Sequence, residues 1–160
     1  CMHCGQRLGS AVPEGDTKRR LVCIDCGFVH YINPRPVAGT IPVDSEGRAL
    51  LVRRAIEPKI GHWVFPGGFM DIGESAEEAA ARETMEEACL EVTNLRLLGV
   101  YTRIAPGVVV IVFVADAEGV GAIGDETSEI GWFHPHEIPW EMIAFDSTEA
   151  ALRDWVALGG

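Results

Sequence analysis

Residues 67–90 restrict the possible folds of this chain more than any other segment. Two adjacent glycines, Gly67 and Gly68, provide a backbone that can turn sharply and approach a ligand. Ser75 and Glu78 have the spacing of a capping box, which predicts a helix over residues 75–89. Three carboxylates of this helix stand at i, i+3 and i+4 and therefore project from one face. These are Glu83, Glu86 and Glu87, and the opposite face, expected to meet the core, holds Ala81, Thr84, Met85 and Ala88.

The spacing of these glutamates allows two interpretations. Three like charges on one helical face repel one another by roughly a few tenths of a kcal/mol per pair. A hard divalent cation would relieve this repulsion, and Mg²⁺, which prefers oxygen ligands and retains several waters, suits such a site. The alternative is a solvated acidic face without a ligand, and spacing alone does not exclude it.

Four of the five cysteines form two matched pairs, Cys1-x-x-Cys4 and Cys23-x-x-Cys26. Each pair is followed directly by a glycine, and two residues between thiolates allow both sulfurs to bind one ion. The 18 residues between the pairs favour one structural zinc ion held by four cysteines. Disulfides or a redox-active pair are the alternatives. His3 and His30 are not expected to bind zinc, because four thiolates already complete a tetrahedral site.

The remaining pattern divides the chain into two units. Residues 1–32 are loop-rich and form the predicted zinc ribbon, and Asn33-Pro34-Arg35-Pro36 is a stiff connector because each proline favours extended backbone before it. Residues 37–158 are expected to form one α/β or α+β sandwich. The predicted strands of this sandwich cover residues 37–43, 49–53, 63–65, 95–102, 108–115 and 130–133.

Two elements of the second unit carry further predictions. Residues 108–115 are apolar on both faces, which indicates a central strand. A last amphipathic helix is expected to be capped by Asp146, with Glu149 at its third position. Its inward face is predicted to hold Ala151, Leu152, Trp155 and Val156.

The charge and hydropathy of the chain limit its partners. A net charge of −11, from 24 acidic and 13 basic residues, disfavours general binding to nucleic acid. Small phosphorylated ligands remain compatible with this charge, because bound divalent cations reverse the local field. No apolar run approaches the roughly 18 residues needed to span a membrane, and no basic-then-apolar signal segment is seen. The expected compartment is the cytoplasm, with no membrane partner.

Residues 68–90 together resemble the Nudix box. That motif consists of Gly, five residues, Glu, seven residues, Arg-Glu, an apolar residue or Thr, one residue, Glu-Glu, one residue, Gly and an apolar residue. Cys89 departs from the motif, since the family has glycine at this position near the helix end, and this lone cysteine is expected to pack and not to react. The matching positions are Gly68, Glu74, Arg82, Glu83, Thr84, Glu86, Glu87 and Leu90.

The resemblance extends over residues 37–158, and the N-terminal ribbon is similar to that of the zinc-ribbon Nudix proteins. It implies an α/β/α sandwich around a mixed β-sheet. It also implies a metal-dependent hydrolase that cleaves the diphosphate linkage of a nucleoside diphosphate derivative.

Three short segments resemble the zinc-ribbon group that acts on ADP-ribose and FAD: residues 29–36, 53–58 and 137–140. NADH pyrophosphatases are the alternative, but they carry a Ser-Gln-Pro-Trp-Pro-Phe-Pro array after the box, where this chain has Tyr-Thr-Arg-Ile-Ala-Pro. A Nudix module that senses a nucleotide without cleaving it, and an adaptor built on the ribbon, are further alternatives.

The resemblance implies roles for the residues of the box. Glu83, Glu86 and Glu87 would hold Mg²⁺ or Mn²⁺, with the Gly68 carbonyl as a further ligand. Arg82 and Glu74 would form a structural pair that orients the loop and the helix.

Other roles fall outside the box. A further catalytic carboxylate is expected from the loop before residues 130–133, with Glu126 as the first candidate and Glu129 as the second. Arg53, Arg54 and Arg103 are candidates for binding the phosphates of a small-molecule nucleotide. A homodimer is compatible with the resemblance, because family members are often dimers.

Overall fold

The computed structural model describes all of residues 1–160 and divides them into two compact units, Cys1–Pro34 and Arg35–Gly160. The division lies between Pro34 and Arg35, within the predicted connector of residues 33–36. The first strand of the second unit begins at Arg35, so the second half of the predicted connector is part of that strand. No helix in either unit combines the length and hydropathy needed to cross a membrane.

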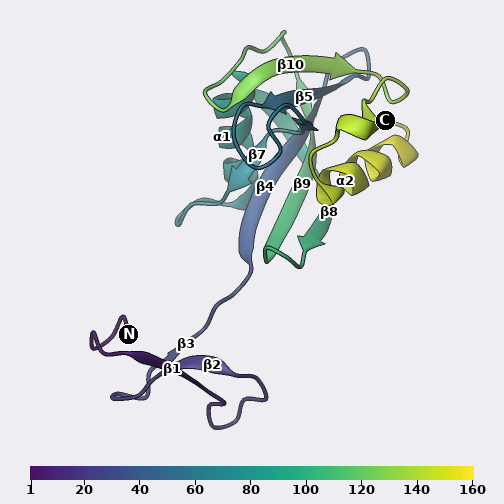
Figure 1. The fold of residues 1–160 in the computed structure, drawn as a ribbon. Helices are drawn as coiled ribbons and strands as arrows, with labels where there is room; N and C mark the ends of the chain where they lie inside the picture. The colour runs from purple at the N-terminus through teal and green to yellow at the C-terminus, as the bar shows by residue number, and fades with distance from the viewer. The chain divides into compact units, whose positions relative to one another are not determined.

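The first unit contains a small antiparallel sheet with the strand order β1-β2-β3 (Figure 1). The strands are β1 (Leu8–Ala11), β2 (Arg20–Cys23) and β3 (Val29–His30). This unit was predicted to be a loop-rich zinc ribbon without assigned strands, because strands of two to four residues carry too little periodicity to be recognised. Cys23 is the only buried residue of this unit, so the unit has almost no apolar core.

The second unit is built on a mixed sheet of seven strands. Five strands follow the order β10-β5-β4-β9-β8, while β6 pairs with β5 and β7 pairs with β4 (Figure 1). The β4–β9 pair is parallel and the other pairs are antiparallel. The predicted central position of residues 108–115 is confirmed, since β9 lies between β4 and β8. The strands are β4 (Arg35–Val43), β5 (Ala49–Arg54), β6 (Trp63–Val64), β7 (Gly67–Phe69), β8 (Val92–Arg103), β9 (Val108–Ala117) and β10 (Thr127–Phe133).

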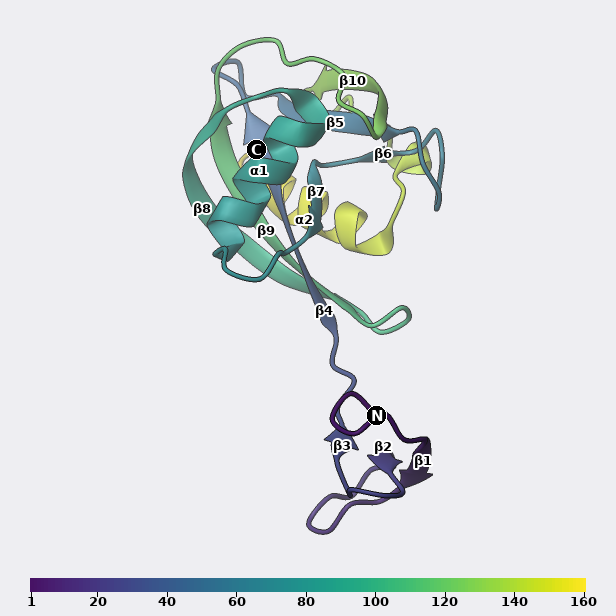
Figure 2. The ribbon, with the colours of Figure 1, turned by 90° about the vertical axis from the view of Figure 1, so that its left-hand side faces the viewer.

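The two helices α1 (Ala76–Ala88) and α2 (Asp146–Ala157) cover opposite faces of this sheet (Figure 2). Successive side chains of a strand point to opposite faces, so β4 and β9 serve both layers. Ala38 and Phe113 pack with Ala79 and Ala80 of α1. On the other face, the α2 residues Leu152 and Trp155 join a cluster that includes Ile41 and Val112. The predicted α/β/α sandwich is therefore confirmed, and a 3₁₀ turn at Trp140–Met142 precedes α2.

The start of α1 agrees with the sequence, whereas one prediction about its core face is wrong. The Ser75 side chain accepts from the Glu78 backbone and the Glu78 side chain accepts from the Ser75 backbone, which is the predicted capping box. Met85, expected in the core, is 41% exposed. Thr84 and Ala88 are buried as predicted, but Ala79, Ala80 and Glu87 complete the buried face, because the helix packs on β4 and β7 with one of its carboxylates turned inward.

The cap of α2 and the strand β7 also differ from the sequence predictions. Phe145, not Asp146, is the N-cap residue and makes no side-chain cap bond. The Asp146 carboxylate instead accepts from the adjacent Ser147 N–H and pairs with Arg103. β7 was missed because a Gly-Gly sequence has low strand propensity, and only its pairing with β4 makes it a strand.

Candidate active site

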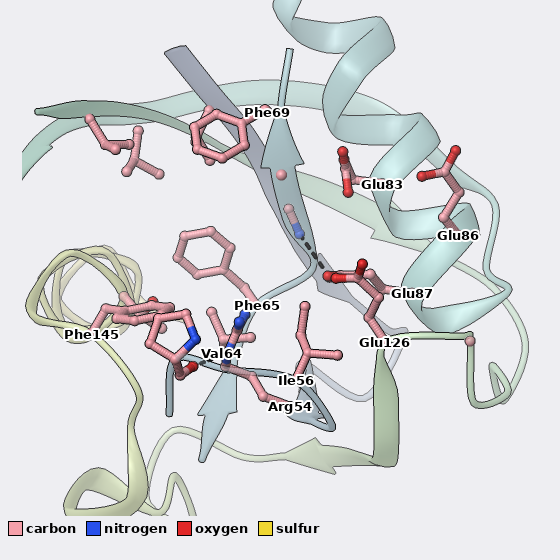
Figure 3. A pocket seen from close by; sticks show the side chains of 18 of the residues that line it. Arg54, Ile56, Val64, Phe65, Phe69, Glu83, Glu86, Glu87, Glu126 and Phe145 are labelled. Carbon is pink, nitrogen blue, oxygen red and sulfur yellow. Dashed lines mark hydrogen bonds between the residues drawn. The ribbon is translucent and has the colours of Figure 1, made fainter. Parts of the chain in front are cut away.

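A cleft of about 890 Å³ opens in the second unit, within the usual size range of small-molecule sites. One wall consists of α1 and β7, and another comes from the segment after β5 and the start of α2 (Figure 3). From α1 come the carboxylates of Glu83, Glu86 and Glu87 and the guanidinium of Arg82, and the rings of Phe65, Phe69 and Phe145 also line the cleft. The cleft thus combines an acidic wall with an apolar one.

Glu87 is the most deeply placed of the α1 carboxylates. Its side chain accepts the Gly67 N–H at 3.0 Å, and the residue is only 9% exposed (Figure 3). Burial raises the pKa of Glu87 to about 7, because a charged carboxylate is poorly solvated there. Burial also raises the pKa of Glu83, whereas Glu86 lies exposed at the surface. A buried, partly unneutralised carboxylate is the environment in which a cation would be stabilising.

Both glycines of β7 are needed for the close approach of backbone and carboxylate. A Cβ atom at Gly68 would overlap the Glu83 carboxylate, and one at Gly67 would lie 2.8 Å from the Cα of Gly39. No other residue leaves room for these contacts. The geometry thus requires glycine at both positions, and Gly68 lies close to the side chain of Glu83, a predicted metal ligand.

Arg82 connects the box residues. It donates to both carboxylate oxygens of Glu74 at 2.8 and 3.1 Å and to the Phe69 carbonyl at 3.2 Å. The hydrogen bonds from Arg82 hold the pKa of Glu74 at about 2. The predicted Arg82–Glu74 pair is thus present and joins the loop to the helix. The same guanidinium also contacts Glu83 at 2.8 Å and Glu86 at 3.1 Å, a contact that the sequence did not predict.

The segment between β9 and β10 closes the C-terminal end of α1 and delivers Glu126 to the cleft. The N–H groups of Ala122 and Gly124 donate to the carbonyls of Ala88 and Glu87 at 2.7 and 3.1 Å. These carbonyls are among those that a helix leaves without partners at its end. A Cβ atom at Gly124 would overlap the Glu86 carbonyl, so glycine is required at this crossing.

Glu126 lies beside Glu87 in Figure 3, and its negative charge contributes to the raised pKa of both Glu87 and Glu83. Glu129, the second candidate, lies outside the cleft lining and pairs with Arg53 at 2.9 Å. The structure thus places the first candidate, and not the second, with the box glutamates.

Two of the three predicted phosphate-binding arginines line the cleft. Arg54 and Arg103 do so, and both guanidinium groups lie over the Phe145 ring, at 5.3 and 4.3 Å from its centroid. Arg53 lies outside the lining, because consecutive residues of β5 point to opposite faces. The structure therefore does not support Arg53 as a phosphate ligand.

Sequence reasoning missed a further arginine of the cleft, Arg35, and the aromatic rings that lie against the arginine side chains. Arg35 lies over the Phe69 ring at 4.2 Å, and both residues line the cleft. Phe69 follows the Gly-Gly pair directly, so its position after the loop was the available signal. No local pattern linked Arg35 or Phe145 to this cleft, because they come from distant parts of the chain.

Cys89 ends α1 in the left-handed conformation, with φ 48° and ψ 43°. This region favours glycine, which explains why the related motif has glycine there. The expectation that Cys89 packs is wrong, because its side chain is exposed at the cleft.

The first unit brings together the four cysteines of its two pairs. Their Sγ atoms all lie within 4.8 Å of one another, with 3.5 Å between Cys4 and Cys23 and 3.8 Å between Cys1 and Cys26. A tetrahedron with Zn–S bonds of about 2.3 Å has edges of about 3.8 Å, so the donor set fits one zinc ion. All four are free thiols, which does not support the disulfide alternative.

The surroundings of the sulfurs agree with a closed four-cysteine site. Gly5 and Gly27 have φ angles of +77° and +73°, as the two tight turns require. Hydrogen bonds from the backbone N–H groups of Cys26 and Asp25 lower the pKa of Cys23 to about 7, which favours the zinc-binding thiolate. His3 stacks on Phe28 and His30 lies in β3, so neither joins the cluster.

Comparison with known proteins gives matches over both units. Residues 33–156 match the NUDIX domain, and residues 1–32 match the family described as Nudix N-terminal. An ADP-ribose pyrophosphatase of Methanocaldococcus jannaschii is 35% identical over 132 residues, covering 79% of this chain and 75% of the relative. An NAD-capped RNA hydrolase NudC of Chromobacterium violaceum is 33% identical over 87% of this chain, which spans only 51% of that relative.

The crystal structure of a NUDIX hydrolase from Nitrosomonas europaea has a TM-score of 0.89 and 39% sequence identity. The likeness covers 96% of this chain and 87% of that one. The box geometry, the four-cysteine cluster and the matches along both units agree with one another. This chain therefore belongs to the Nudix hydrolase family and carries the family's zinc-ribbon N-terminal unit.

Proposed function

We propose that this enzyme hydrolyses the diphosphate linkage of a nucleoside diphosphate derivative, with ADP-ribose and FAD as the first candidates and Mg²⁺ or Mn²⁺ as the cofactor. One observation carries the proposal. The buried Glu87 carboxylate is held against the Gly67 N–H, with Glu83 and Glu126 beside it, in a cleft that also contains Arg54 and Arg103.

Glu83, Glu86 and Glu87 would hold the divalent cation, together with the Gly68 carbonyl. Carboxylate and carbonyl oxygens are the ligands that such hard cations prefer. When bound, the cation neutralises charge that develops on phosphorus and lowers the pKa of a water molecule. The chain itself supplies the remaining functions.

Arg54 and Arg103 would bind the outer phosphate oxygens, because both guanidinium groups line the cleft, where each lies over the Phe145 ring. Glu126 would accept the proton of the attacking water, since it is a carboxylate outside the box that lines the cleft with Glu83, Glu86 and Glu87. Phe65, Phe69 and Phe145 supply an apolar wall that limits the access of bulk water.

The similar ADP-ribose pyrophosphatase supports ADP-ribose as a substrate class. The NudC relatives favour a second candidate, an NAD-type dinucleotide such as NADH. This chain spans about half the length of the NudC relatives. Hydrolysis of NAD-capped RNA, the activity in their name, is therefore not part of the present proposal.

The proposal includes the remaining expectations about partners. The ligand is a small nucleotide, and neither nucleic acid nor a membrane is a required partner. We also propose a cytoplasmic location and a homodimer as the assembly.

A substrate screen tests this function. ADP-ribose, FAD, NADH and nucleoside triphosphates are each incubated with the protein in Mg²⁺, in Mn²⁺ and in a chelator. We expect metal-dependent release of a nucleoside monophosphate from ADP-ribose or FAD, and loss of about 100-fold or more in Glu87→Gln. Nucleotide binding without hydrolysis under any metal condition would identify a sensing module and refute the enzymatic proposal.

A further inference from the structure

A buried hydroxyl pair links the glutamate helix to the centre of the sheet. Thr40 of β4 and Thr84 of α1 are both fully buried, and their Oγ1 atoms lie 2.7 Å apart. Thr84 Oγ1 also donates to the Ala80 carbonyl at 2.7 Å. A hydroxyl has one proton to donate, so Thr40 must donate to Thr84 in this pair.

Thr40 is also bonded to the segment that leads into the cleft. Its N–H donates to the Pro66 carbonyl at 3.0 Å, and the preceding Gly39 is the register partner of Gly67. On the helix, Thr84 directly follows Glu83 and stands three residues before Glu87. The pair therefore connects the backbone of residues 66–68 to the helical turn that carries two predicted metal ligands.

The apolar contacts of α1 with β4 do not fix the position of the helix along its axis. They are made largely by small side chains, with Ala79 and Ala80 packed against Ala38. Such contacts are non-directional, so a small axial shift loses little of them. A buried hydrogen bond is directional, and leaving its donor without a partner is energetically costly. The threonine pair is thus a buried, directional contact between α1 and β4 that resists sliding of the helix.

We propose that Thr40 and Thr84 are positioning residues that keep Glu83 and Glu87 in register with Gly67 and Gly68, and so set the affinity of the site for a divalent cation. The role of the ion rests on the proposed function, whereas the register is a property of the metal-free protein. An error of about 1 Å in such an arrangement is enough to change activity strongly.

Isosteric substitutions separate the hydroxyl from the side-chain volume. Valine removes the hydroxyl and serine retains it, so Thr40→Val, Thr84→Val, the double variant and both serine variants are compared. Mn²⁺ binding is measured by calorimetry without substrate, alongside thermal unfolding. Each valine variant should bind Mn²⁺ about fivefold more weakly or worse, and the double variant no more weakly than either single one, because the two hydroxyls act as a unit. The serine variants should stay within about twofold of the parent.

Leu152→Val is the matched control for stability. Leu152 is fully buried in α2 on the opposite face of the sheet and lies outside the cleft lining. This control loses buried volume, so it should unfold at a lower temperature but bind Mn²⁺ like the parent. The proposal is overturned if the valine variants bind Mn²⁺ normally, if serine weakens binding as much as valine, or if Leu152→Val weakens it equally. Should a valine variant fail to fold, Thr84→Cys takes its place. Its thiol is a weak hydrogen-bond donor, so it should bind Mn²⁺ more weakly than the parent but by less than the loss of about fivefold expected for valine.

Hydrogen exchange at the Gly67 amide distinguishes this inference from the proposed function. That N–H is bonded to Glu87, so loss of register in Thr84→Val should speed its exchange about tenfold relative to Leu152→Val. Unchanged exchange would refute the positioning role, whether or not the parent binds Mn²⁺. A parent protein that binds no Mn²⁺, or binds it and hydrolyses no nucleotide, would instead refute the proposed function.

Discussion

Individual residues in the cleft owe their properties to small differences in placement. Glu83, Glu86 and Glu87 come from one helix, yet only Glu87 is buried, and Glu86 lies exposed. Burial raises the pKa of Glu87 to about 7, so this carboxylate gains most from a neighbouring cation. Identical side chains therefore contribute unequally to one site.

Glu126 and Glu129 form a natural pair of test and control. Glu126→Gln removes a charge beside Glu87 and should reduce turnover by about 100-fold or more if Glu126 accepts a proton from water. Glu129→Gln breaks only an exposed pair with Arg53, and its turnover should stay within about twofold of the parent. Steady-state kinetics on the substrate found in the screen provide the measurement. Equal effects of the two substitutions would contradict the assignment of Glu126.

Cys89 is predicted to strain the end of α1. Cys89→Gly should raise the free energy of unfolding by about 0.5–1 kcal/mol, because glycine adopts the left-handed region without the penalty of a Cβ atom. Cys89→Ala retains the Cβ atom and should bring no such gain. Urea unfolding of the three proteins tests this difference. A gain from alanine as large as that from glycine would assign the effect to the thiol and not to the backbone.

At the scale of elements, local side-chain bonds fix where strands and helices begin and end. The Ser75–Glu78 capping box starts α1, and the Asp44 side chain closes the turn between β4 and β5. Asp44 accepts from the N–H groups of Glu46 and Arg48 at 3.0 and 2.8 Å, and from Arg48 Nε at 2.7 Å. Such contacts span few residues, so the sequence pattern shows them directly.

The Asp44 turn should contribute a pH-dependent part of stability. Burial alone would raise the pKa of Asp44, but the hydrogen bonds from Arg48 and Glu46 lower it below its usual value of 3.8. A carboxyl with a lowered pKa adds stability above its unfolded pKa and loses it as the pH falls through the folded value. Asp44→Asn should therefore cost about 1–2 kcal/mol at pH 7, and the difference from the parent should shrink below about pH 4. Unfolding curves at several pH values test this, and a difference that stays constant into acid would contradict it.

At the scale of the whole molecule, the two units are stabilised in different ways. The second unit has buried clusters on both faces of its sheet, with residues such as Ile41, Leu51 and Leu152 fully buried. In the first unit only Cys23 is buried, and large apolar side chains such as Met2 and Ile24 are exposed. A unit of this size cannot hold itself together by apolar burial, so it needs a metal or a covalent link.

Removal of the zinc ligands should therefore unfold the ribbon selectively. The Cys23→Ser, Cys26→Ser double variant is expected to contain no zinc, whereas the parent holds about one zinc per chain, with a binding free energy of roughly 10 kcal/mol or more. Protease cleavage should appear within residues 1–34, while the second unit stays folded and keeps part of its activity. Elemental analysis and limited proteolysis measure these outcomes. A parent protein without zinc, or cooperative loss of both units, would contradict the prediction.

The sequence alone determined the features that depend on neighbours along the chain. The helix over the box, its capping box, the common face of its three glutamates and the two cysteine pairs follow from spacing and from the period of the backbone. The central position of β9 followed from its apolar character on both faces. The resemblance to the family then predicted the sandwich fold and the Arg82–Glu74 pair.

Only the tertiary structure decided which members of each candidate set meet in the cleft. It selected Glu126 over Glu129 and placed Arg54, but not Arg53, against Phe145. Arg53 and Glu129 are 76 residues apart in sequence, and their contact depends on the register between β5 and β10. A shift of one residue in that register would turn each side chain to the other face, and no local pattern encodes it. Spacing along the chain therefore defines the chemistry that is available, and strand register defines which of those groups share one site.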